Sequence, residues 1–247
     1  IGNVWKFPYM CGEFGGAAFI LIYLIFLLIL GIPVMICEFA VGRGSRLSVA
    51  ASFEKLEPEG TRWHVMKWIG VIGCYLLMMF YTTVGGWMMY YCYRSIKGEF
   101  VGASSDTVAE GFTDMLGNVP VMTFWTVLIC VVGFAVCYFG IQKGIERVSK
   151  VMMSALLLIM VVLVIHSIFL EGAEDGIRFY LVPDFARMKE IGIGNVIFGA
   201  MSQAFFTLSI GIGAMLIFGS YIGQERSLSG EAASITLLDT FVALMAG

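Results

Sequence analysis

The sequence predicts an all-α integral membrane protein that crosses the bilayer several times. Hydrophobic residues make up 59% of the 247 residues and charged residues only 13%, with a mean hydropathy of +0.89. An ordinary soluble domain holds roughly half apolar and about a quarter charged residues. Apolar runs of about 20 residues, the length that crosses a hydrocarbon core, recur along the chain. Together these observations exclude a soluble domain.

The apolar runs follow one another with short polar connections between them. The predicted full spans are residues 17–41, 68–93, 121–140, 151–170 and 195–220. Two shorter apolar runs, at residues 1–10 and 236–247, flank them and are expected to be parts of further helices. The chain has no starting Met and stops within an apolar run, so the sequence indicates a piece of a longer membrane protein.

Lys and Arg residues are unevenly distributed between the connections. The loops after the first and third predicted spans hold more of them than the loops on the opposite side, which places these two loops in the cytoplasm. They are Arg43, Arg46, Lys55, Arg62 and Lys67 in the first loop and Lys143, Arg147 and Lys150 in the second. The expected location is the plasma membrane. The sequence contains no basic patch of the kind that binds nucleic acid.

The span at residues 195–220 is weakened at its centre. The stretch AFFTLSIGIGAML, residues 204–216, contains a threonine, a serine and two glycines. Glycine destabilises a helix, and backbone freed from a helix is tolerated in a membrane only where it is buried in protein or lines a wet cavity. The stretch IGNVWKFPYM at the start of the chain is interrupted in the same way. Two such segments are typical of inverted-repeat transporters, although two flexible kinks without a ligand would leave the same pattern.

Polar side chains inside the predicted spans require a reason, because burying them in a bilayer is costly. Glu38 follows GIPVMIC and either reaches interfacial water or accepts hydrogen bonds from a broken neighbouring helix. His166 has no His, Asp or Glu three or four residues away, so we interpret it as a packing residue rather than a metal ligand. Tyr81 provides a hydroxyl at mid-span, beside Gly85 and Gly86, which are expected to allow close helix approach.

These segments resemble the neurotransmitter:sodium symporters, which carry amino acids and amines together with sodium. The motifs GNVWKFPY, GGAAF, GIPVMICEFAVGRG, KGIERVSK, PDF and QAFFTLSIGIGAM occur in the family's order. The resemblance implies an inverted-repeat symporter fold with discontinuous first and sixth helices, from the outer part of helix one to the start of helix seven. Residues 1–170 would complete the first five-helix repeat. Residues 171–247 would form an outer loop, the broken sixth helix and the start of the seventh.

The resemblance also implies a binding site for the substrate. The Tyr81 hydroxyl and backbone amides near Gly2 would hold the substrate carboxylate, and Phe206 would form an aromatic lid. Leu77 and Ile212 would line the apolar side-chain pocket. The implied substrate-binding residues are Gly2, Leu77, Tyr81, Phe206, Thr207, Ser209 and Ile212.

A sodium site and two supporting elements are implied by the same resemblance. Asn3 and Thr207 would give oxygen ligands to sodium, a hard cation that prefers such donors, and Asp239 would lie beside it. Lys6 would belong to the outer gate together with the Phe206 lid. Glu38 would support the unwound sixth helix.

Several residues differ from the family's usual pattern. Lys6 stands where many members carry an arginine, so the charge is kept but the planar bidentate fork is lost. Asp239 stands where a sodium-binding asparagine is usual, and Ala243, one turn later, lacks the hydroxyl that chloride-dependent relatives use. We therefore expect sodium as the coupled ion, with no requirement for chloride. Ile212 replaces a frequent aromatic residue and indicates an apolar pocket without a ring.

The residues and the resemblance together predict sodium-coupled symport of an apolar amino acid by alternating access. Two alternatives stay open: a non-transporting amino-acid sensor of the same fold, and an amine transporter, which would carry an acid just before Ile1. An enzyme is not expected, because His, Asp, Glu and Cys are dispersed among the spans. A channel would need a ring of filter charges, which the sequence lacks. The expected partners are the amino-acid substrate and the lipid bilayer, and a homo-oligomer is left open.

Overall fold

The computed structural model describes residues 2–138 and 146–247, and every regular element in these two ranges is a helix. The helices pack into two units, one formed by residues 1–73 and 155–247 and the other by residues 74–154. The predicted all-α class is confirmed. The predicted division at residue 170 follows sequence repeats rather than packing, and it stays a prediction. Ile1 and Gly140, which end two predicted helices, lie outside the described residues.

Five helical stretches in the described ranges are long and apolar enough to cross a membrane. They are Ala17–Ser45, Trp63–Ile96, Val119–Tyr138, Arg147–Ile168 and Leu228–Ala246. The first four agree with predicted spans. The sequence predicts the fifth only as a short apolar start at residues 236–247, which is wrong because its first turns are polar. Ser227 caps this helix by accepting a hydrogen bond from the N–H of Gly230 at 3.3 Å, so it begins well before the apolar run.

The chain enters the first unit through a widened turn. The π-helical η1 (Gly2–Lys6) continues into α1 (Phe7–Glu13), whose Pro8 lies in the first turn, where a missing N–H is tolerated. Gly15 and Gly16, with φ of 90° and 63°, then reverse the chain. The first full span follows as α2 (Ala17–Phe26), η2 (Leu27–Gly31) and α3 (Ile32–Ser45). The short helices α4 (Val49–Leu56) and η3 (Trp63–Val65) lead to α5 (Met66–Ile96).

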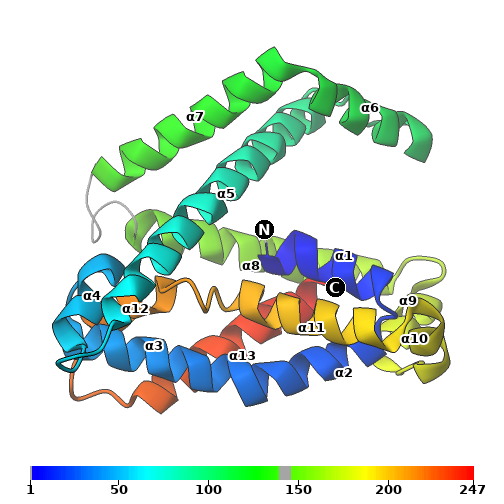
Figure 1. Ribbon diagram of the computed structural model, residues 1–247. Coiled ribbons are helices and arrows are strands. Elements are labelled where there is room, and N and C mark those ends of the chain that lie inside the picture. Colours follow the sequence, from blue (N-terminus) through cyan, green and yellow to red (C-terminus); the bar gives the residue numbers. More distant parts are fainter. Residues whose placement is uncertain (1, 139–145) are drawn as a thin grey trace. The chain divides into compact units, whose positions relative to one another are not determined.

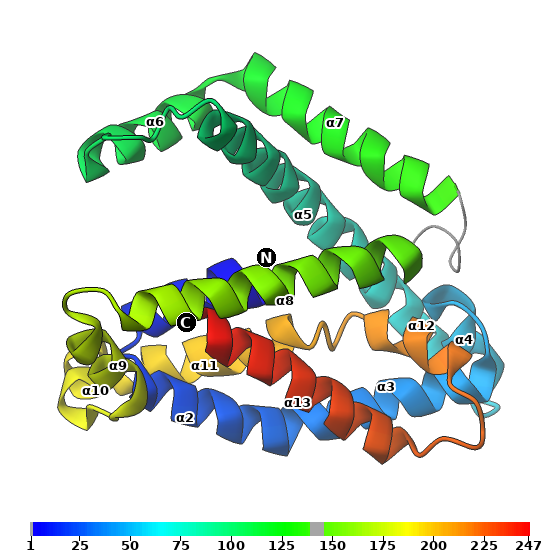
Figure 2. The ribbon, with the colours of Figure 1, turned by 180° about the vertical axis from the view of Figure 1, so that it is seen from behind.

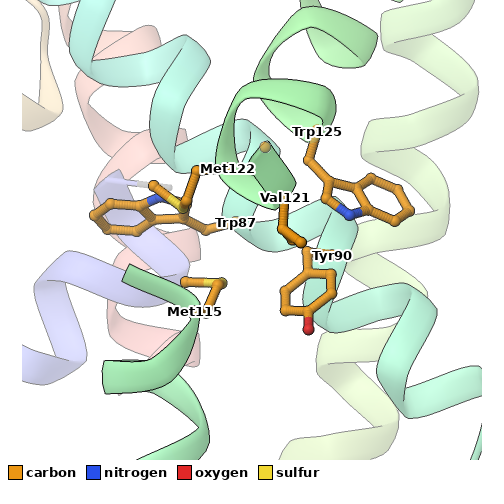
Figure 3. Close-up of a pocket in the computed structure, with 7 residues that line it drawn as sticks. Trp87, Tyr90, Met115, Val121, Met122 and Trp125 are labelled. Atoms are coloured by element: carbon orange, nitrogen blue, oxygen red, sulfur yellow. The ribbon is translucent and has the colours of Figure 1, made fainter. Parts of the chain in front are cut away.

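The second unit contains most of α5, α6 (Ser105–Gly117), α7 (Val119–Tyr138) and the start of α8 (Arg147–Ile168). A Cβ added at Gly86 would lie 2.9 Å from the backbone N of Thr126, so α5 and α7 approach closely, as predicted. Beside this crossing, aromatic and methionine side chains from α5, α6 and α7 converge (Figure 3). The space between them is too small to admit a water molecule, which makes this cluster a packing core rather than a binding site.

The chain returns to the first unit within α8, and two short helices of that unit follow, α9 (Ala173–Leu181) and α10 (Phe185–Ile191). The Asp184 carboxylate caps α10 by accepting from the N–H groups of Ala186 and Arg187. The Tyr180 hydroxyl donates to the carbonyl of Leu244 at 3.0 Å. Burial raises the pKa of Tyr180, so the hydroxyl stays protonated and ties α9 to the end of α13 (Leu228–Ala246).

The weakened segment at residues 195–220 is two separate helices. α11 (Ile193–Thr207) and α12 (Ala214–Tyr221) are joined by a non-helical stretch, visible in Figure 1 and from behind in Figure 2. Within this stretch Ser209, Gly211 and Gly213 have φ of 51°, 89° and 77°, in the left-handed region that an α-helix cannot contain. The predicted discontinuity of the sixth helix is therefore confirmed, and neither half alone is long enough to cross a bilayer.

The two halves of the broken helix pack against different parts of the first span. α11 lies along α2, and α12 lies along α3. A Cβ added at Gly219 would lie 2.6 Å from the Cα of Phe39, and one added at Gly42 would overlap the carbonyl oxygen of Leu216. These two glycines therefore let the backbones of α3 and α12 touch, which fixes the position at which the chain must unwind between α11 and α12.

We expect Gly42→Ala to destabilise the protein by about 1–3 kcal/mol, because the added methyl must displace backbone of α12 rather than a flexible side chain. Thermal unfolding of the purified protein in detergent measures this as a lowered Tm. Gly133→Ala in α7 is the matched control, since nothing lies within 4 Å of a Cβ there. The control should leave the Tm unchanged or raise it. An equal Tm for Gly42→Ala and the parent would contradict the close contact.

Candidate functional site

Three polar side chains meet at the end of α11, where the interruption of the broken helix begins. Asn3 lies on η1, Thr207 is the last residue of α11, and Asp239 lies in the middle of α13. The Asn3 amide Nδ2 donates to the Asp239 carboxylate Oδ1 at 2.7 Å and to the Asp239 carbonyl at 3.1 Å. The Thr207 hydroxyl lies 2.5 Å from Asn3 Oδ1 and 2.8 Å from Asp239 Oδ2. Residues more than 200 positions apart in the chain thus form one cluster of oxygen atoms.

This oxygen cluster contains more acceptors than protons. Thr207 carries one hydroxyl proton, so it can donate to either Asn3 Oδ1 or Asp239 Oδ2 at a given moment, but not to both. The remaining lone pairs face one another at short range in a half-buried position. A carboxylate, an amide oxygen and a hydroxyl are the donors that hard cations prefer, so the cluster has the chemistry of an alkali or alkaline-earth cation site.

Several buried polar atoms have no hydrogen-bond partner in the described part of the chain. Three of them lie on α2, α11 and α13: the Tyr23 hydroxyl, Gln203 Oε1 and Thr236 Oγ1. Gln203 is fully buried one turn before Thr207, and its Nε2 donates to the carbonyl of Gly2 at 3.4 Å. The sequence patterns do not indicate Gln203 or Tyr23 as residues of the site. The available signal for Gln203 was an uncharged polar residue four positions before Thr207 in an otherwise apolar helix.

The Phe206 ring contacts one predicted substrate-binding residue, Gly2, and one predicted gate residue, Lys6. A Cβ added at Gly2 would lie 3.3 Å from the Phe206 ring, and the Lys6 ammonium lies 3.6 Å from the ring centroid. A cation over an aromatic face is attracted by the ring quadrupole, by about 0.5–2 kcal/mol depending on exposure. The structure therefore joins Gly2, Lys6 and Phe206 into one group next to the oxygen cluster.

Glu38 contacts the unwound backbone directly. The N–H of Gly211 donates to Glu38 Oε1 at 2.6 Å, and the carboxylate faces the first turn of α12 at Met215 and Leu216. A negative charge is favoured there by the unpaired N–H groups of a helix N-terminus. Of the two interpretations open at the sequence level, the geometry matches the bond to a broken helix.

The remaining predicted substrate residues fall into two groups. Ser209 and Ile212 lie in the unwound stretch of the first unit, both half-buried, and Ile212 packs against Gly73 of α5. Leu77 and Tyr81 lie four residues apart on one face of α5, within the second unit. The first unit thus brings together Gly2, Asn3, Lys6, Glu38, Phe206, Thr207, Ser209, Ile212 and Asp239, while Leu77 and Tyr81 belong to the other unit.

Comparison with known proteins tests the family resemblance. The model of the sodium:neurotransmitter symporter family matches residues 1–109 and 104–247, which is the whole chain. The chain belongs to this family. The resemblance drawn from the sequence motifs is confirmed, and the chain is a multi-pass membrane protein of a family of transporters, not of enzymes.

Two bacterial members of the symporter family are similar to the entire chain. An uncharacterized sodium-dependent transporter of Bacillus subtilis (strain 168), YhdH, is 38% identical over 248 residues, covering 100% of this chain and 54% of the relative. An uncharacterized sodium-dependent transporter of Haemophilus influenzae is 32% identical and covers 100% of this chain and 55% of the relative. The chain therefore spans about half the length of the relatives it matches.

A solved structure gives the same result for the fold. The crystal structure of MhsT in complex with L-phenylalanine superposes with a TM-score of 0.88 at 38% sequence identity, over 99% of this chain and 55% of that one. A more distant relative, the sodium- and chloride-dependent GABA transporter 2 of Rattus norvegicus, is 28% identical over 100% of this chain and 46% of its own length. The fold of this chain is thus the fold of the matched part of MhsT.

We expect Glu38→Gln to loosen the unwound stretch, because a charged acceptor bonded to a backbone N–H contributes about 1.5–3 kcal/mol. Amide hydrogen exchange of peptides covering residues 208–213 should accelerate about tenfold or more. Glu59→Gln, at an exposed loop position, is the control and should leave exchange at residues 208–213 unchanged. Identical exchange in Glu38→Gln and the parent would show that this bond does not hold the break.

Proposed function

We propose that the protein is a sodium-coupled symporter of an amino acid with an apolar side chain. The observation that carries this proposal is the oxygen cluster of Asn3, Thr207 and Asp239, which lies where α11 ends and the helix is interrupted. In inverted-repeat carriers, ion and substrate sites lie where discontinuous helices meet. Membership of a sodium-dependent family supports sodium as the cation.

Sodium would be held by Asn3 Oδ1, Thr207 Oγ1 and the Asp239 carboxylate. A cation at this position satisfies the lone pairs that one hydroxyl proton cannot pair. It would also place positive charge near Gly2, where the substrate carboxylate is proposed to bind. Sodium and the substrate then each favour the binding of the other, and this mutual dependence couples the sodium gradient to substrate uptake.

The substrate would be held through its carboxylate and enclosed by apolar walls. We assign the carboxylate to the Tyr81 hydroxyl and the backbone N–H groups near Gly2, and the lid to Phe206. Leu77 and Ile212 would contact the side chain, with Thr207 and Ser209 at the helix break. The match to MhsT, whose structure contains L-phenylalanine, supports an amino acid with an apolar side chain.

Lys6 and Glu38 would have separate supporting roles, one at the lid and one at the broken helix. Lys6, by its contact with the Phe206 ring, would keep the lid closed on the outer side. Glu38 would keep α12 attached to the first span while the unwound stretch changes conformation. A non-transporting sensor or an amine transporter of the same fold would retain the oxygen cluster, so transport and substrate class must be measured.

Uptake into proteoliposomes tests the proposed function. The complete protein is reconstituted and a mixture of labelled amino acids is supplied outside, under an inward sodium gradient or an equal potassium gradient. Accumulation driven only by sodium, and inhibited by unlabelled apolar amino acids, is the expected result. Binding without accumulation would identify a sensor. In a parallel assay with labelled serotonin, sodium-driven accumulation of this amine without accumulation of any amino acid would overturn the amino-acid assignment.

Tyr81→Phe should weaken amino-acid binding by more than the usual 0.5–1.5 kcal/mol of one hydrogen bond, about tenfold or more, because a charged acceptor loses its donor. Equilibrium binding of labelled L-phenylalanine at saturating sodium measures the change. Tyr75→Phe is a suitable control, because Tyr75 lies on an exposed part of α5. Unchanged affinity in Tyr81→Phe would refute its assigned role.

Transport should not require chloride. Asp239 supplies a fixed negative charge beside the proposed sodium position, and the buried Ala243 one turn later has no hydroxyl to bind an anion. Initial rates of sodium-driven uptake should therefore be equal in chloride and gluconate media. A severalfold loss of rate in gluconate would contradict this assignment.

A further inference from the structure

Ile212 rests on a glycine face of α5. A Cβ added at Gly73 would lie 3.2 Å from Cγ2 and 3.7 Å from Cβ of Ile212. One turn earlier, a Cβ added at Gly70 would lie 3.3 Å from the Ile212 carbonyl oxygen and 2.6 Å from Cγ1 of Val49. The backbone and the side chain of Ile212 therefore contact two successive glycines of the same helix, both within the first unit.

The contact at Gly73 differs in kind from the contact at Gly70. At Gly73 the nearest atoms belong to the Ile212 side chain, so an added methyl would move that side chain. At Gly70 the nearest atoms are the buried Val49 side chain and the Ile212 backbone, so an added methyl would move the unwound stretch as a whole. The missing side chain of Gly73 thus leaves the space against α5 in which the Ile212 side chain packs.

The position of Gly73 along α5 connects this contact to the substrate. Gly73 precedes Leu77 by four residues and Tyr81 by eight, so the three share one helical face. Leu77 and Ile212 are the proposed walls of the side-chain pocket, and this step rests on the proposed function. Because Gly73 has no side chain, Ile212 can pack close to α5. The closer Ile212 lies to α5, the more room the pocket leaves for the side chain of the substrate.

We propose that Gly73 is a specificity-determining positioning residue, which admits large apolar side chains by letting Ile212 sit back against α5. It acts through Ile212. A β-carbon at position 73 would push the Ile212 side chain by a few tenths of an ångström or more toward the substrate, and a tightly packed pocket discriminates by single methyl groups. A glycine here therefore favours phenylalanine-sized and leucine-sized substrates over smaller ones.

The test compares substrate selectivity rather than activity alone. Sodium-dependent binding of L-phenylalanine, L-leucine and L-alanine is measured for the complete protein and for Gly73→Ala. We expect the affinity for L-phenylalanine to fall about tenfold or more relative to L-alanine, whose affinity should be unchanged or improved. The double variant Gly73→Ala with Ile212→Ala removes the displaced side chain and should restore the ratio of the two affinities.

Gly70→Ala is the matched control, since it disturbs the same helix face without touching the Ile212 side chain. It should change all three affinities by a similar factor. A uniform change in Gly73→Ala, or a loss of L-phenylalanine selectivity that Ile212→Ala does not reverse, would overturn the proposal. If the unaltered protein binds none of the three amino acids with sodium, the proposed function fails instead, which keeps the two failures distinguishable.

Discussion

The unwound stretch between α11 and α12 is the constraint on which the rest of the structure depends. Backbone polar groups freed inside a membrane must find partners within the protein. Glu38 supplies one such partner by accepting from the N–H of Gly211, and the glycine contacts at Gly42 and Gly219 hold α12 against the helix that carries Glu38. The break is thereby fixed at residues 208–213, which leaves Thr207 at the end of α11 with its hydroxyl directed at Asn3 and Asp239.

The chemistry of the site depends on where α11 ends. A helix that ends at Thr207 places a hydroxyl, an amide and a carboxylate together, although η1, α11 and α13 are far apart in the sequence. These groups hold too few protons for their lone pairs, which supports the proposed cation site. Gly2, Phe206 and Lys6 adjoin this cluster, and the substrate carboxylate is proposed to bind near Gly2.

Much of the fold could be predicted from the sequence, because membrane spans depend mainly on length and hydropathy. The break in the sixth helix was also predictable, since its glycines stand out in an apolar run. The start of α13 was not, because Ser227 and Glu231 make its first turns polar. The resemblance to the symporter family supplied the candidate site residues. The burial of Gln203, whose Oε1 lacks a partner, and the contact between Gly73 and Ile212 depend on packing between distant segments, which no local pattern encodes.

Sodium titration of the Asp239→Ala variant tests the central claim most directly. Binding of labelled L-phenylalanine to the complete protein is followed as sodium is raised at constant ionic strength. The control is Glu231→Ala, which removes a half-buried carboxylate that pairs with Arg226 in the first turn of α13, outside the oxygen cluster. If the oxygen cluster binds sodium, the half-saturating sodium concentration should rise about tenfold or more in Asp239→Ala. This is the loss of sodium affinity expected when a charged ligand is removed. An unchanged sodium dependence in that variant would contradict the account.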